Sequence, residues 1–216
     1  MRDRQMAWGL LRLFGDRSGK LEPDLVSLRK GNEARTDPLR ILDSDSFSAI
    51  NRVLRGMPGY KHSQFVPTGR NGEALADGSI NVDLEEMPFP ADSFDIIMTS
   101  DVMEHVLRDD RAHEEIFRCL APGGTYLFTV PYDPTLSGHR RLTQLAGDTY
   151  FILERHIHGD PHSASGIIAH RIYGGPLSQD LQAFGYSVRF EMVDCPANGI
   201  FGGDLFFARK DDQGRV

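Results

Sequence analysis

The chain has 216 residues, of which 40% are hydrophobic, and this is enough for one domain with a substantial core. A formal net charge of −7 provides no general positive field, so nucleic acid is not expected as a partner. The two cysteines, Cys119 and Cys195, are too far apart for a metal spacing or a disulfide framework, which fits a reducing cytoplasm. No apolar run approaches the roughly 20 residues of a membrane span, so no membrane partner is expected.

The N-terminal stretch "MRDRQMAWGLLRLFGDRSGK" has a basic start and a short apolar segment. An early aspartate and the lack of a small-residue cleavage site favour an amphipathic surface helix over a signal peptide. We therefore interpret 1–37 as a helical extension or lid, which is also a candidate element for a homodimer. The main domain is predicted to cover 38–216.

Strand patterns alternate with helical patterns after residue 38. Predicted strands lie at 39–43, 60–66, 79–84, 94–100 and 125–132. Such alternation is typical of βαβ units and a parallel sheet. Two last strands, 186–194 and 203–210, are joined by a short loop and are expected to be antiparallel neighbours. The predicted fold is α/β: a Rossmann-like, seven-stranded, mostly parallel sheet with a C-terminal antiparallel hairpin and helices on both faces.

Two helices carry clear signals. The helix after the first strand is predicted to bury one face formed by Phe47, Ile50, Val53 and Leu54. The clearest helix is "DDRAHEEIFRCLAPGG" at 109–124. It is expected to be capped by Asp109 or Asp110 and to end at Gly123.

Two longer motifs occur in the middle of the chain, "VDLEEMPFPADSFDIIMTSDVMEHV" at 82–106 and "LAPGGTYLFTVP" at 120–131. The first joins an acid at a strand end, a Pro-Phe-Pro loop, an "SFD" strand start and an "EHV" turn. The second is an "L-x-PGG" turn into a strand. Together they resemble the class I S-adenosylmethionine (SAM) dependent methyltransferases, in their small-molecule branch. The resemblance is strongest over 39–131.

This resemblance implies that SAM is the cofactor and that a small molecule accepts the methyl group. In an open α/β sheet, ligands bind at the carboxyl ends of the strands. The cofactor-binding residues that the resemblance implies there are Asp43, Ser44, Asp45, Gln64, Asp83, Leu84, Ser100 and Asp101.

Each of these residues has an implied role. Acids and hydroxyls at the first strand suit the cationic methionine end of SAM. Gln64 stands where the family usually has an acid for the ribose. Asp83 and the backbone N–H of Leu84 would meet the adenine, and Ser100 and Asp101 would face the reacting methyl. Alternatives remain for three of them: Asp43 could cap the following helix, Asp83 could be a solvated loop acid, and Gln64 could be an ordinary exposed strand end.

The first strand end departs from the family pattern. An acid followed by three alternating glycines reads here as Asp43, Asp45, Phe47 and Ala49. SAM has no pyrophosphate, the group that most needs a glycine loop, so its methionine end can be held by side chains. The lost glycines nevertheless support a second hypothesis, a catalytically impaired binding or scaffold protein. A nicotinamide-dependent oxidoreductase is disfavoured because no G-x-G-x-x-G follows the first strand.

Two histidines are the candidate catalytic bases, His158 first and His105 second, because imidazole titrates near neutral pH. A base would be needed if the acceptor atom is a hydroxyl oxygen, as we expect. His158 belongs to "RHIHGDPH" within 133–175, a histidine-rich segment that we predict to be the acceptor-binding insertion. No metal site is expected. Whether Glu104 with His105, or the histidines at 156–162, bind metal is left open by the sequence.

Overall fold

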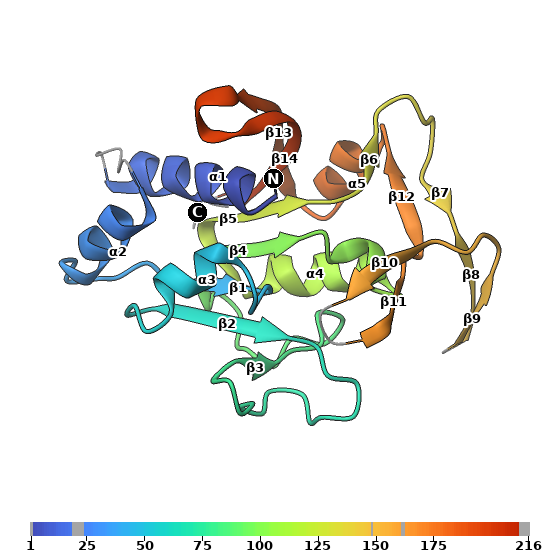
Figure 1. The fold of residues 1–216 in the computed structure, drawn as a ribbon, viewed down its shortest axis with the longest axis horizontal. Coiled ribbons are helices and arrows are strands. Elements are labelled where there is room, and N and C mark those ends of the chain that lie inside the picture. Colours follow the sequence, from blue (N-terminus) through green and yellow to red (C-terminus); the bar gives the residue numbers. More distant parts are fainter. Residues whose placement is uncertain (1, 19–23, 148, 161–162, 212–216) are drawn as a thin grey trace, which may run out of the picture.

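A computed structural model of the protein describes residues 2–18, 24–147, 149–160 and 163–211. Its main sheet contains β1 (Ile41–Asp43), β2 (Tyr60–Gln64), β3 (Ile80–Asn81), β4 (Phe94–Ser100), β5 (Leu120–Thr129), β13 (Tyr186–Cys195) and β14 (Ile200–Lys210). The strand order is β13-β14-β5-β4-β1-β2-β3 (Figure 1). The five strands β5, β4, β1, β2 and β3 are parallel to one another, whereas β14 is antiparallel to both β5 and β13. This confirms the predicted sheet and its C-terminal hairpin.

Helices cover both faces of the sheet, as predicted. One face packs against α1 (Arg2–Ser18), α2 (Leu25–Glu33) and α3 (Ala49–Leu54). The other face packs against α4 (Asp109–Cys119) and α5 (Leu177–Ala183). The strands divide between the two cores by alternation, because successive side chains of a strand point to opposite faces. In β4, for example, Ile96 and Met98 lie on the α1 side and Ile97 on the α4 side.

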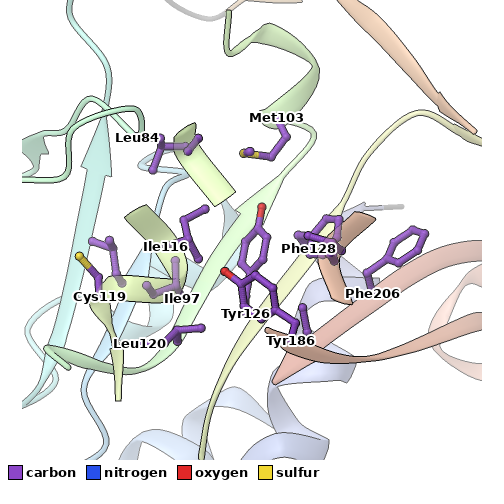
Figure 2. Packing of buried hydrophobic residues seen from close by; sticks show 14 of the residues in the cluster. Leu84, Ile97, Met103, Ile116, Cys119, Leu120, Tyr126, Phe128, Tyr186 and Phe206 are labelled. Atoms are coloured by element: carbon purple, nitrogen blue, oxygen red, sulfur yellow. The ribbon is translucent and has the colours of Figure 1, made fainter. Parts of the chain in front are cut away.

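Aromatic rings fill much of the core on the α4 side (Figure 2). Tyr126 stacks on Phe128 with ring centroids 4.4 Å apart, and Phe128 stacks on Phe206 at 5.0 Å. The hydroxyl of Tyr126 is buried but bonds to Thr99 Oγ1 at 2.6 Å. This satisfied core fixes β4 and β5, and therefore the turns at their carboxyl ends.

The N-terminal helix α1 shares its core with the sheet. Leu10 and Phe14 are buried, and Gly9 lies against Leu127 and Leu205. A Cβ at residue 9 would come within 2.9 Å of both leucine side chains, so glycine allows the helix to approach the sheet closely. The amphipathic helix is thus observed, while the domain boundary at residue 37 stays a prediction. None of the described helices is long and apolar enough to span a membrane.

Three local predictions were wrong. Phe47 is 50% exposed, because it lies in the turn before α3 and not on the buried face formed by Ile50 and Leu54. Arg108 occupies the N-cap of α4, so Asp109 lies in its first turn and caps nothing there.

The end of α4 also differs from the prediction. The helix ends at Cys119, before the expected stop at Gly123. Pro122 gives the reason, since the residue before a proline is pushed out of the helical region. Leu120 is already extended and begins β5.

The segment at 133–175 interrupts the alternation of strands and helices. Its described part is built of short strands: β6 (Tyr132–Asp133), β7 (Arg140–Arg141), β8 (Thr143–Ala146), β9 (Thr149–Ile152), β10 (Ile157–Asp160), β11 (Ser163–Ile168) and β12 (Arg171–Gly174). The hairpin of β10 and β11 lies beyond the carboxyl end of β4 (Figure 1). It therefore reaches the edge where the sequence places its candidate residues.

Candidate functional site

The turn after β4 begins with Asp101, a non-glycine residue at φ 49°. This left-handed conformation is uncommon for a residue with a side chain, although aspartate tolerates it better than most. Thr129 Oγ1 donates to Asp101 Oδ1 at 2.8 Å, and Arg2 forms an ion pair with Oδ2. The Asp101 carboxylate is thus tied to β5 and to the first turn of α1, and Ser100 lies half-buried before it.

Glu104 follows in the short 3-10 helix η1 (Met103–His105), and its side chain is fully buried. Both carboxylate oxygens lack a hydrogen-bond partner among the described residues. Burial, followed by the nearby charge of Asp101, raises the pKa of Glu104 to about 8. Such a group is costly to bury unless a proton or a cation compensates it.

The two candidate catalytic histidines, which lie 53 residues apart in the chain, meet in space. His158 Nδ1 is 3.2 Å from His105 Nε2. His105 Nδ1 is 2.7 Å from the carbonyl oxygen of Ile168, which can only accept, so Nδ1 carries the proton of a neutral His105. Its Nε2 then accepts from His158 Nδ1, and this leaves a lone pair on His158 Nε2. Burial, and next the neighbouring His156, lower the pKa of His158 and favour its neutral form.

Arg171 holds the η1 turn from behind. It is buried and donates to the carbonyl oxygens of Met103, Val106 and Leu107 at 2.6–2.8 Å. It also pairs with Asp109 Oδ1 at 3.2 Å. Sequence reasoning missed this residue, whose only signal was an arginine within the short strand pattern "RIYG".

A cavity of about 340 Å³ lies beside the histidine pair. Its wall includes Arg2, Asp101, Thr129, Tyr132, His158 and Asp204. These residues come from α1, from the ends of β4 and β5, and from the strands of the inserted segment and the hairpin. The cavity is large enough for a small molecule and adjoins the one candidate base that is less deeply buried.

The turn after β1 is arranged differently. Asp43 is buried and accepts from Tyr60 Oη at 2.7 Å, Asp45 N at 3.0 Å and Ser48 Oγ at 3.4 Å. Burial nevertheless raises the pKa of Asp43 to about 7. Its carboxylate thus points into the protein, and Ser48 is the residue that caps α3, by accepting from Asn51 N. The capping role considered for Asp43 is therefore wrong.

The next two residues of this turn also bond internally. Ser44 Oγ donates to the carbonyl oxygen of Met98 at 3.0 Å. Asp45 Oδ1 accepts from the backbone N–H of Phe47 at 2.9 Å. The side chains of Ser44 and Asp45 thus help to build the turn itself, and Asp45 stands at one of the three positions where the family pattern has glycine.

The remaining cofactor candidates lie at the ends of β2 and β3. Gln64 donates to Ser79 Oγ at 2.8 Å, and its carbonyl oxygen is buried without a partner among the described residues. Asp83 is half-buried and accepts from Glu85 N at 2.9 Å, while Leu84 is buried in the core. The structure therefore places them at the predicted edge.

Of the other histidines near His158, His156 lies with its ring centroid 5.1 Å from that of His158. His162 lies outside the described residues. The spacing of two between His156 and His158 thus brings one further histidine close to the pair of His105 and His158.

Part of the chain that contributes to this site is similar to known proteins. Residues 68–128 match a family model described as a methyltransferase domain. The Vibrio vulnificus ubiquinone/menaquinone biosynthesis C-methyltransferase UbiE is 42% identical over 59 residues. That match covers 26% of this chain and only 23% of the relative. The matched family segment includes Asp83, Asp101, Glu104 and His105.

Solved structures show the same fold. An S-adenosylmethionine-dependent methyltransferase from Mesorhizobium loti has a TM-score of 0.50 and 19% identity, over 79% of this chain and 90% of that one. The [4+2]-cyclase SpnF has a TM-score of 0.51 and 18% identity, over 87% of this chain and 80% of that one. The fold thus matches that of a SAM-dependent methyltransferase, and residues 68–128 match a methyltransferase domain, in agreement with the resemblance that the two motifs carry. A neighbour described as a cyclase also shows that the fold by itself does not define the reaction.

Proposed function

We propose that the protein transfers a methyl group from SAM to the hydroxyl oxygen of a small-molecule acceptor. The observation that carries this proposal is the hydrogen-bonded pair of His105 and His158 at the end of β4, beside a cavity of about 340 Å³. The family match supports the cofactor, because its segment contains the strand ends after β3 and β4.

SAM would lie along the carboxyl ends of β1 to β4. In this arrangement Asp83 and the Leu84 N–H would hold the adenine. The carbonyl oxygen of Gln64, which has no hydrogen-bond partner within the described part of the chain, would accept from a ribose hydroxyl. Ser100 and Asp101 lie toward the reacting methyl. The methionine end would contact the turn at 43–45 chiefly through backbone groups, because its side chains already have partners.

The acceptor would bind in the cavity, with its hydroxyl toward His158. Its oxygen attacks the sulfonium methyl carbon, the carbon–sulfur bond breaks, and S-adenosylhomocysteine leaves as the neutral thioether. The acceptor proton passes to His158 Nε2, the atom that carries the lone pair when Nδ1 donates to His105. The protein contributes mainly by holding acceptor and methyl in line.

Two segments would shape acceptor selection. The segment at 133–175 provides His158 and, next to its start, Tyr132 in the cavity wall. The segment at 1–37 contributes Arg2, and this contact supports its proposed role as a lid. A homodimer, a cytoplasmic location and the lack of a nucleic-acid or membrane partner remain predictions from the sequence.

The test is a methyl-transfer assay that follows S-adenosylhomocysteine release with a panel of hydroxylated small molecules and sugars. With an accepted substrate, we expect His158→Ala to lower kcat at least about 100-fold while SAM affinity stays within twofold. His156→Ala, from the same loop, is the matched control and should retain activity. Equal activity of His158→Ala and the wild type would exclude His158 as the base.

A catalytically impaired binding or scaffold protein is the second candidate. It is favoured by the turn at 43–48, whose side chains are engaged with one another and not presented to a ligand. Calorimetry with SAM separates the two candidates. No heat and no thermal shift at millimolar SAM would support the second and exclude the enzyme.

A further inference from the structure

We propose that Glu104, His105 and His158 form a binding site for a divalent transition-metal ion. The three residues offer one ligand atom each, and all these atoms lie within 4.8 Å of one another. They come from η1 and β10, two elements that the fold alone brings together.

The spacing of the three atoms matches a metal site. His105 Nε2 and His158 Nδ1 are 3.2 Å apart, and each lies 3.6 Å from Glu104 Oε1. A point equidistant from the three lies about 2.0 Å from each, which equals the bond length of imidazole nitrogen and carboxylate oxygen to zinc. The triangle thus fits an ion without movement of the backbone.

A second, independent observation comes from Glu104. Its side chain is fully buried, and neither oxygen has a hydrogen-bond partner among the described residues. A buried carboxylate without a donor is destabilising, and a bound cation would remove that cost.

The support around the triad is also that of a metal site. His105 Nδ1 lies 2.7 Å from the carbonyl oxygen of Ile168, and such an outer hydrogen bond orients the ring so that Nε2 faces the ion. His170 N donates to the backbone carbonyl oxygen of Glu104 at 2.7 Å, and Arg171 fixes the rest of the turn. The ligands are therefore held before an ion arrives.

The donor set indicates the class of metal. Two imidazoles and one carboxylate suit zinc, iron(II), cobalt or manganese, whereas calcium and magnesium prefer oxygen ligands alone. Three protein ligands leave coordination positions open for a small molecule. His158 also lines the cavity beside the triad, so an acceptor bound there would lie close to the ion.

The use of the ion in methyl transfer rests on the proposed function. An ion would take the lone pair of His158 Nδ1 and move its proton to Nε2, so His158 could no longer act as the base. The acceptor hydroxyl would then be activated by coordination, which lowers the pKa of a bound hydroxyl so that its proton passes to water as the oxygen takes the methyl group. His158 can therefore act either as a metal ligand or as the catalytic base, but not as both at once.

Metal binding is tested directly by calorimetry on chelator-treated full-length protein with ZnCl2, MnCl2 and MgCl2. We expect one saturable Zn²⁺ site per chain with a dissociation constant of about 1 μM or lower. Mg²⁺ should bind at least tenfold more weakly. The site is excluded if neither Zn²⁺ nor Mn²⁺ binds saturably.

Variants locate the site. Glu104→Gln and His158→Ala should each weaken Zn²⁺ binding at least tenfold, which is about 1.4 kcal/mol. His156→Ala should change it less than twofold. Unchanged affinity in both triad variants, or an equal loss in His156→Ala, would show adventitious binding by surface histidines. If Glu104→Gln fails to fold by circular dichroism, His158→Ala decides, because its side chain is 24% exposed and easier to replace.

The two proposals can fail separately. Zn²⁺ binding at the triad without SAM binding would retain the metal site and exclude the methyltransferase. Methyl transfer by metal-free protein that binds no Zn²⁺ would exclude the metal site and retain the His158 base.

Discussion

Two buried carboxylates lie at the carboxyl ends of the neighbouring parallel strands β1 and β4, and they differ in their hydrogen bonds. Asp43, the last residue of β1, accepts from three donors that lie in the following turn and in the next strand. Glu104, after β4, accepts from none among the described residues. Burial raises the pKa of both, to about 7 and about 8.

The difference supports the proposal that the Glu104 carboxylate binds a ligand, whereas the Asp43 carboxylate serves the fold. Hydrogen-bond donors offset part of the free-energy cost of burying a carboxylate, whereas a buried carboxylate without donors keeps the full cost. The Asp43 turn holds its own shape. The Glu104 turn is held from outside by Arg171, and its inner side faces two histidines.

The largest effect should come from the external support of the Glu104 turn. Arg171→Ala removes three hydrogen bonds to buried carbonyl oxygens and the pairing of Asp109. We expect a loss of about 3–5 kcal/mol in the free energy of unfolding, measured with denaturant. Arg140→Ala, which breaks only the exposed pair with Glu154, should cost less than about 1 kcal/mol. Equal losses would mean that the turn does not depend on Arg171.

The contribution of Asp43 to stability can be measured as a function of pH. The pKa of Asp43 is about 7 in the folded state, against an ordinary value of 3.8. Between these two pH values the folded state binds the proton, whereas the unfolded state has released it. The contribution of Asp43 to stability is therefore complete below pH 4 and is lost as pH rises toward 7. Asp43→Asn does not titrate, so its stability relative to wild type should rise by about 1–3 kcal/mol from pH 5 to pH 8. Parallel curves of unfolding free energy would contradict this.

Asp83, which follows β3, tests whether a carboxylate at a strand end binds SAM or only stabilises its own turn. Asp83 accepts only a local backbone bond, from Glu85 N, among the bonds described for its side chain. Asp83→Ala should weaken SAM binding at least tenfold, about 1.4 kcal/mol, as measured by calorimetry. Asp43→Asn is the matched control and should leave SAM affinity within about threefold if the Asp43 turn only serves the fold. An unaffected Asp83→Ala would show that the adenine lies elsewhere.

The smallest loss of stability is expected from removing the N-cap of α3, which is Ser48. Ser48→Ala removes the acceptor of Asn51 N and should cost about 1 kcal/mol in thermal or denaturant unfolding. Ser187→Ala removes one exposed bond to Asp211 and should cost less. A neutral Ser48→Ala would mean that the turn keeps its shape without this bond.

Much of the fold could be predicted from the sequence, because hydrophobic period and chain order are local signals. Strands such as 94–100 and the final hairpin were placed correctly by pattern alone. The errors were local as well. Phe47 was assigned to a helix that begins two residues later, and Pro122 ended α4 before Gly123.

The sequence by itself determined which residue types lie at the carboxyl edge of the sheet, and it nominated His105 and His158 separately. Only the tertiary structure decided that they touch, since they are 53 positions apart in the chain and His158 belongs to the β10–β11 hairpin, which the fold brings to the turn that contains His105. It also decided that the Asp43 side chain turns inward and that no described residue donates a hydrogen bond to the Glu104 carboxylate. Hydrogen-bond satisfaction depends on what packs around a group, and no periodicity in the chain encodes that.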